Sequence, residues 1–100
     1  MPGFFLTNKA KADLKDIGRY TKSKWGRAQR DKYLTMLDAH FQDLAEEPLK
    51  GRDCSHIQNG YRKYSAGSHV IFYRQMATDT IEIVRVLHGR MDTERHLSEP

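Results

Sequence analysis

The sequence predicts an α+β domain with the element order β-α-α-β-β-β, in which a helical hairpin packs on a small antiparallel sheet. The first observation behind this prediction is a helical period of apolar residues between residues 9 and 47. The second is a set of strand-like segments, separated by short turns, between residues 61 and 88. The third is the length of 100 residues, which suffices for one core and two layers. We therefore treat residues 1–100 as one domain, with residues 93–100 expected to form a flexible tail.

The chain is expected to begin with a short strand that leads directly into a helix. The apolar run that starts at Gly3 ends at Thr7 and Asn8, two residue types that favour the N-cap of a helix. From there the core-facing positions are spaced by four, three and four residues, at Ala10, Leu14, Ile17 and Thr21. This spacing is the period of an amphipathic helix. Gly26 stands where a C-cap glycine belongs.

A second amphipathic helix is predicted immediately after Gly26. Its apolar positions are spaced by three, four and three residues, at Leu34, Leu37, Phe41 and Leu44. Glu47 and Pro48 end the pattern, because proline is incompatible with a continuing helix. Since so short a turn separates the two helices, they must fold back on each other as a hairpin.

The second half of the chain is predicted to form a three-stranded antiparallel meander after a loop at Gly51–Gly60. Its strands are Tyr61–Ser65, His69–Arg74 and Thr80–His88, joined by connections short enough to be hairpin turns. In the last strand, alternation places Ile81, Ile83 and Leu87 on one face and Val84 and Val86 on the other. Because both faces would be apolar, this strand is expected to be central in the sheet.

Positive charge is concentrated in the first helix and the start of the second. Residues 9–32 contain nine basic and three acidic side chains, an excess of +6, whereas the whole chain has a net charge of +4. Such a sector is typical of a surface that attracts nucleic acid or an acidic protein partner. A solvated helix face also carries charge of this kind, so the pattern alone does not identify the partner.

Composition indicates the cellular compartment of the protein and excludes some kinds of binding site. A single cysteine, Cys54, excludes an intramolecular disulfide and favours a reducing compartment, so we expect a cytoplasmic location. The apolar runs are far shorter than the roughly 18–20 residues of a membrane span, and no membrane contact is expected. The histidines and Cys54 lack the spacing of metal ligands, and the glycines form no phosphate-binding loop. We therefore expect no metal and no cofactor.

Several short motifs, in this order, resemble the RelE/ParE superfamily of bacterial toxins from type II toxin–antitoxin pairs. They include Trp25-Gly26, the segment Gly60–Tyr64 and the strand His69–Arg74. The segment Ile81–Asp92 is similar to the ParE branch in particular. The resemblance covers almost the whole chain and implies the fold predicted above. It also implies a partner, a mostly disordered antitoxin that folds on the toxin and neutralises it.

The superfamily contains two activities, and they require different residues. RelE-like members cut messenger RNA in the ribosome, with a tyrosine near the C-terminus, whereas ParE-like members poison DNA gyrase without catalysis. Residues 89–96 contain no tyrosine, so we predict a ParE-like binding inhibitor with no catalytic residue. A metal-independent ribonuclease stays open, because several cationic side chains on neighbouring strands could converge on a phosphate. So does a nontoxic, basic nucleic-acid-binding module.

Two groups of side chains are the candidate sites. The toxic surface, which would contact gyrase, is predicted to include Arg62, Lys63, Arg74, Arg85, His88 and Arg90. The surface for a cognate acidic antitoxin is predicted to include Lys15, Arg19, Lys22, Arg27 and Arg30. Direct binding of nucleic acid is left open.

Overall fold

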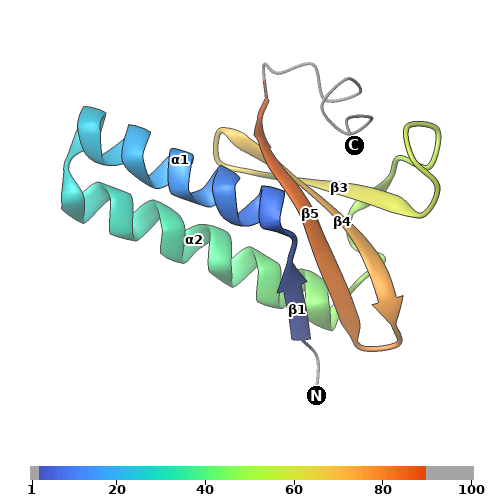
Figure 1. The fold of residues 1–100 in the computed structure, drawn as a ribbon. Coiled ribbons are helices and arrows are strands. Elements are labelled where there is room, and N and C mark those ends of the chain that lie inside the picture. Colours follow the sequence, from blue (N-terminus) through green and yellow to red (C-terminus); the bar gives the residue numbers. More distant parts are fainter. Residues whose placement is uncertain (1–2, 90–100) are drawn as a thin grey trace.

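Two helices cover one face of a five-stranded sheet in the computed structural model, which describes residues 3–89 (Figure 1). Helix α1 spans Asn8–Trp25 and helix α2 spans Arg27–Glu46, so a single residue, Gly26, forms the turn between them. The backbone of Gly26 has φ 91° and ψ 171°, a conformation that only glycine adopts without strain. The predicted helical hairpin and its turn are confirmed.

The strands are β1 (Gly3–Leu6), β2 (Arg52–Asp53), β3 (Tyr61–Ala66), β4 (His69–Ala77) and β5 (Thr80–His88). Their order in the sheet is β1-β5-β4-β3-β2, and β5 is central as predicted. Strands β2 to β5 pair antiparallel, whereas β1 pairs parallel with β5 and makes the sheet mixed. Strand β2 lies within the predicted loop. It was not predicted, because two residues are too few to show an alternating pattern.

A bulge in β5 changes which side chains face the helices. Phe72 is opposite Arg85, but the next residue, Tyr73, is opposite Ile83, so β5 contains one extra residue at this point. Val86 therefore joins Ile83 in the cluster under the helices, whereas Leu87 joins Phe72 on the opposite face. The prediction that Leu87 shares a face with Ile81 and Ile83 was wrong, because strict alternation assumes an uninterrupted strand.

The main core fills the space between the helical hairpin and the sheet. Leu37, Phe41 and Leu44 of α2 pack there against Ile71 and Ile83 of the central strands. A second, smaller cluster lies on the opposite face of the sheet, where Cys54 is fully buried with Phe72 and Leu87. We call this second side the open face, because neither helix covers it (Figure 1).

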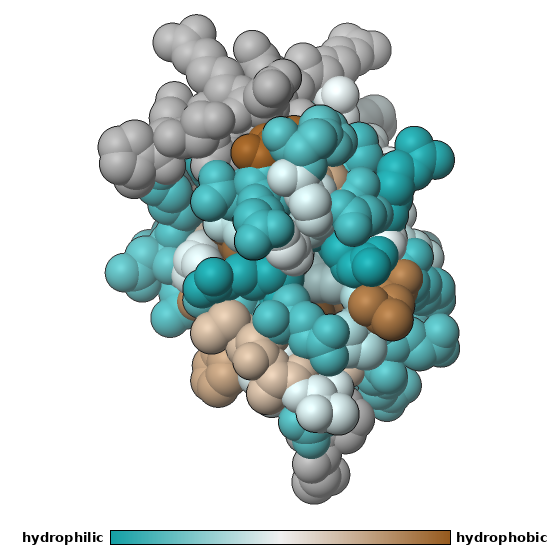
Figure 2. All heavy atoms as spheres, turned by 90° about the vertical axis from the view of Figure 1, so that its right-hand side faces the viewer, coloured by the Kyte–Doolittle hydropathy of each residue, from teal (hydrophilic) through white to brown (hydrophobic). Residues whose placement is uncertain are grey.

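The outer surface at the end of the molecule opposite the hairpin turn is mostly hydrophilic, with small separate hydrophobic patches (Figure 2). Within residues 3–89, neither helix is long and apolar enough to cross a membrane.

Candidate functional site

A groove between α1 and α2 brings together most of the predicted antitoxin surface. Its volume is about 470 Å³, and it is lined by Leu14, Lys15, Gly18, Arg19, Lys22, Arg30, Asp31 and Leu34. Four of the five predicted cations are therefore in one place, while Arg27 is exposed at the start of α2 and does not line the groove. We call this feature the hairpin groove.

The hairpin groove combines four cations and one carboxylate, Asp31, with a partly apolar floor, and Arg30 is paired with Asp31 at 2.9 Å. Leu14 and Leu34 are half-buried and contact the main core, so their outer sides form the floor. Gly18 is buried, and a Cβ there would lie 3.4 Å from Leu34 Cδ1, so its lack of a side chain keeps the groove open. Such a site fits an amphipathic peptide that presents apolar side chains flanked by carboxylates.

Arg62 and Arg74 of the predicted toxic surface are engaged within the molecule. The Arg62 guanidinium donates a hydrogen bond of 2.6 Å to the carbonyl of Gly51, which ties β3 to the loop after α2. The Arg74 Nε donates to Glu82 at 2.9 Å across the β4–β5 pair. Arg74 is exposed, so this second pair is compatible with contact to another molecule.

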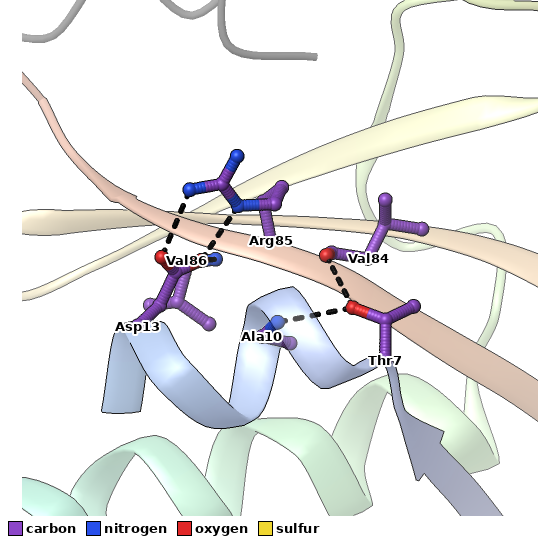
Figure 3. A network of polar contacts seen from close by, with 6 residues as sticks. All are labelled: Thr7, Ala10, Asp13, Val84, Arg85 and Val86. Atoms are coloured by element: carbon purple, nitrogen blue, oxygen red, sulfur yellow. Dashed lines mark hydrogen bonds and ion pairs between the residues drawn. The ribbon is translucent and has the colours of Figure 1, made fainter. Parts of the chain in front are cut away.

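Arg85 is held by Asp13 of α1 (Figure 3). Its Nε and Nη2 donate to the two carboxylate oxygens of Asp13 at 2.8 and 2.9 Å, and both side chains are only 13% exposed. The backbone N–H of Val86 also donates to Asp13, at 3.0 Å. A two-point Arg–carboxylate pair of this kind fixes the guanidinium in place.

The same polar network bonds to the backbone of β5 beyond the point where β1 ends (Figure 3). The Thr7 hydroxyl donates to the carbonyl of Val84 at 2.7 Å and accepts from the backbone N–H of Ala10 at 3.0 Å. Thr7 and Asp13 therefore attach the first turns of α1 to the bulged part of β5. Asp13 was missed because it is 72 residues away from Arg85 and lies among lysines on a polar helix face.

Lys63 lines a hollow on the open face of the sheet. The hollow has a volume of about 440 Å³ and combines two cations, Arg52 and Lys63, with the apolar side chains of Val70 and Phe72. Arg52 was not among the predicted site residues, because its place opposite Lys63 follows from the β2–β3 register and leaves no signal in the sequence.

His88 lies at the end of β5, beside a second histidine. The rings of His88 and His69 are 5.5 Å apart, and Nδ1 of His69 is hydrogen bonded to the Tyr33 hydroxyl at 2.6 Å. The pKa of His69 is lowered from its ordinary value, first because burial penalises the charged ring and second because His88 is close. An open groove of about 240 Å³ adjoins both rings and is lined also by Ile17 and Tyr20 of α1.

The described toxic-surface candidates do not converge on one point. Lys63 pairs with Phe72 and therefore shares the open face, whereas Arg62 pairs with Tyr73, which lies in the core under the helices. Arg85 is at the edge next to α1. Arg90 and the predicted tail at residues 93–100 lie outside the described residues.

The described residues offer little for metal binding or thiol chemistry. Within residues 3–89, no group of three or more His, Cys, Asp or Glu side chains is arranged to hold a metal ion. The Cys54 thiol is buried, and burial raises its pKa, which disfavours the reactive thiolate.

A chain from a solved toxin–antitoxin system shares this fold. A solved structure described as the chromosomal ParDE TA system from P. aeruginosa superposes with a TM-score of 0.74, covering 88% of this chain and 96% of that one. Its sequence identity to this chain is 20%, so this likeness establishes the fold alone.

Sequence comparisons establish the family. Residues 4–93 match the family model described as the ParE toxin of the type II toxin–antitoxin system parDE. Toxin ParE1 of Mycobacterium tuberculosis is 45% identical over 94 residues, covering 94% of this chain and 96% of the relative. Toxin ParE1 of Caulobacter vibrioides is 40% identical (97% and 99% coverage), and toxin ParE of Escherichia coli is 32% identical (99% and 96%). This chain therefore belongs to the ParE toxin family, which confirms the predicted branch of the superfamily.

Proposed function

We propose that this chain stops bacterial growth by binding DNA gyrase in the cytoplasm, without catalysis, and that an acidic antitoxin neutralises it by binding the hairpin groove. Membership of the ParE family supports the toxin role. The gyrase target rests on the resemblance to ParE-like toxins, which act in this way.

The hairpin groove is the observation that carries the antitoxin part of the proposal. The groove is lined by four cations and one carboxylate, and Leu14 and Leu34 form its floor. An acidic amphipathic segment complements both the excess positive charge and the apolar floor. A disordered antitoxin that folds on binding would gain apolar contacts from the floor and orientation from the cations.

The arrangement of the arginines favours binding over RNA cleavage. Cleavage without a metal requires a base, an acid and cations around one phosphate. Arg62 and Arg85 are committed to contacts inside the molecule, and Lys63 lies on a different face of the sheet from Arg62. Of the described candidates, Arg74 and His88 are exposed, as contact with a protein partner requires.

The test is expression of the chain with and without its cognate antitoxin. We expect growth to stop, with DNA breaks, an SOS response and filamentation while messenger RNA stays intact, and we expect co-expressed antitoxin to restore growth. Undisturbed growth at confirmed expression would contradict the toxin role. Cleavage of messages in ribosomes, abolished by Lys63→Ala or His88→Ala, would instead establish a ribonuclease. Arg85→Ala is unsuitable for this comparison, because it breaks the buried pair with Asp13.

A further inference from the structure

The two helices project beyond the sheet (Figure 1), and the tip of the hairpin is exposed. All residues from Lys22 to Gln29 are exposed, and we call this segment the hairpin tip. It contains three cations, no acidic residue and Trp25, the only tryptophan of the chain. Tyr20, next to the tip, is also exposed, and the centre of its ring lies 5.9 Å from Lys24 Nζ.

The region around the tip carries more than the whole net charge of the protein. Residues 19–32 contain six basic side chains and one acidic side chain, a charge of +5, whereas the complete chain has +4. The remainder of the protein is therefore at −1. A field of this shape directs the projecting end of the hairpin toward polyanions.

Folding does not explain the composition of the tip. Trp25 is 69% exposed and belongs to neither hydrophobic cluster of the described residues. Helix α2 begins with Arg27, has no acidic residue in its first turn and lacks a side-chain cap. Because the N-terminus of a helix is the positive end of its dipole, a cation there opposes helix stability. Lys22 and Lys24 do suit the C-terminus of α1, so Trp25 and Arg27 are the two residues that require another explanation.

We propose that the hairpin tip binds single-stranded nucleic acid, with a base stacked on Trp25 and with Lys24 and Arg27 contacting the flanking phosphates. Exposed aromatic rings between cations are the features by which proteins bind single strands without sequence preference. The site adjoins the antitoxin surface, because Lys22 belongs to both the tip and the hairpin groove, but Trp25, Lys24 and Arg27 do not line the groove. The proposal does not depend on gyrase being the target.

The composition of the tip favours a single strand over the other polyanions. An acidic polypeptide would satisfy the cations but offers no planar base for the indole ring. An anionic membrane would need a wider apolar face, whereas the neighbours of Trp25 include Ser23 and Gln29. In a duplex the bases are already stacked on one another, so Trp25 would lack a partner.

The experiment uses the intrinsic fluorescence of Trp25, which reports on this position alone because the chain has no other tryptophan. The full chain is titrated with an oligothymidylate of about 12 nucleotides, within the range of known single-strand site sizes. Affinities of the variants are measured by the anisotropy of a labelled oligothymidylate. The variants are Trp25→Ala, Lys24→Glu and Arg27→Glu, each checked by thermal melting.

The matched control is Lys11→Glu, which changes the net charge equally at an exposed position near the other end of α1. We expect quenching by the single strand. Trp25→Ala should weaken binding roughly 5- to 150-fold. Lys24→Glu and Arg27→Glu should each lower the slope of log affinity against log salt by about 0.7. Melting temperatures should change only slightly, upward for Arg27→Glu and downward for Lys24→Glu, because each change reverses a charge at a helix end.

Four results would overturn the proposal. They are the absence of quenching, an effect of Lys11→Glu as large as that of Lys24→Glu, equal quenching by a duplex of the same length, and equal or stronger binding to polyglutamate or to phosphatidylglycerol vesicles.

Discussion

The Asp13 carboxylate joins α1 to β5 through three hydrogen bonds, two from Arg85 and one from the backbone of Val86. Asp13→Asn keeps the shape of the side chain but removes the charge that balances a mostly buried guanidinium. We expect a loss of about 2–4 kcal/mol in the free energy of unfolding, measured by urea denaturation. Asp16→Asn is the control, since Asp16 and its partner Arg19 are exposed. Equal effects of the two changes would mean that the buried pair contributes no more than a surface pair.

The surroundings of His69, between Tyr33 and His88, predict how the stability of the protein depends on pH. The pKa of His69 is lowered by burial and by His88, against a smaller opposing effect of Asp13. The unfolded chain therefore binds a proton at this ring more readily than the folded chain does. The stability from a neutral His69 is complete above about pH 6.5 and is lost as the pH falls through the lowered pKa. The free energy of unfolding, measured between about pH 7.5 and 5, should therefore fall less for His69→Gln than for the parent. Parallel curves would contradict this.

At the scale of elements, the sequence predicts helices and turns, because these depend on residues close together along the chain. The spacing of Leu34, Leu37 and Phe41 was enough to predict α2, and Gly26 marked the turn. The bulge in β5 was not predictable, because it depends on how Phe72 and Tyr73 pair across the sheet and on the reach of Asp13 from α1. The parallel pairing of β1 depends likewise on contacts between distant parts of the chain.

Two glycines of the hairpin should respond in opposite ways to the same substitution. Gly26→Ala forces a side chain into a positive-φ conformation and should cost about 1–3 kcal/mol. Gly18→Ala lies inside α1, where a Cβ meets Leu34 at an ordinary contact distance of 3.4 Å, so it should stabilise the protein by about 0.5–1 kcal/mol. Thermal melting of both variants checks the contrast. A stabilising Gly26→Ala would show that the single-residue turn tolerates a different backbone geometry.

At the scale of the whole molecule, the two predicted sites differed in how far the sequence could locate them. The cations of the hairpin groove share a face because the helical period of 3.6 residues places Lys15, Arg19 and Lys22 on one side of α1. The toxic-surface candidates come from different strands, and the face each occupies depends on register. The position of Arg52 and the hydrogen bond from Arg62 to the Gly51 carbonyl could not be predicted, because both depend on how the segment of β2 lies against β3.

The separation of these sites predicts that neutralisation and toxicity can be lost independently. In Lys15→Glu/Arg19→Glu, two cations of the hairpin groove are reversed while the open face is unchanged. Antitoxin affinity, measured by calorimetry, should fall tenfold or more, equivalent to about 1.4 kcal/mol or more. Growth should still stop on expression, and co-expressed antitoxin should no longer restore it fully. Lys63→Glu alters the hollow beside Arg52 and should do the reverse, weakening growth inhibition while antitoxin binds as before. Lys11→Glu matches the charge change of Lys63→Glu, and Lys11→Glu/Lys32→Glu, at two exposed positions outside the groove, matches that of the double variant. Melting confirms that each variant is folded. If the groove variant lost toxicity while folded, the surface that contacts the cellular target would lie on the helices, and antitoxin and target would compete for the same groove.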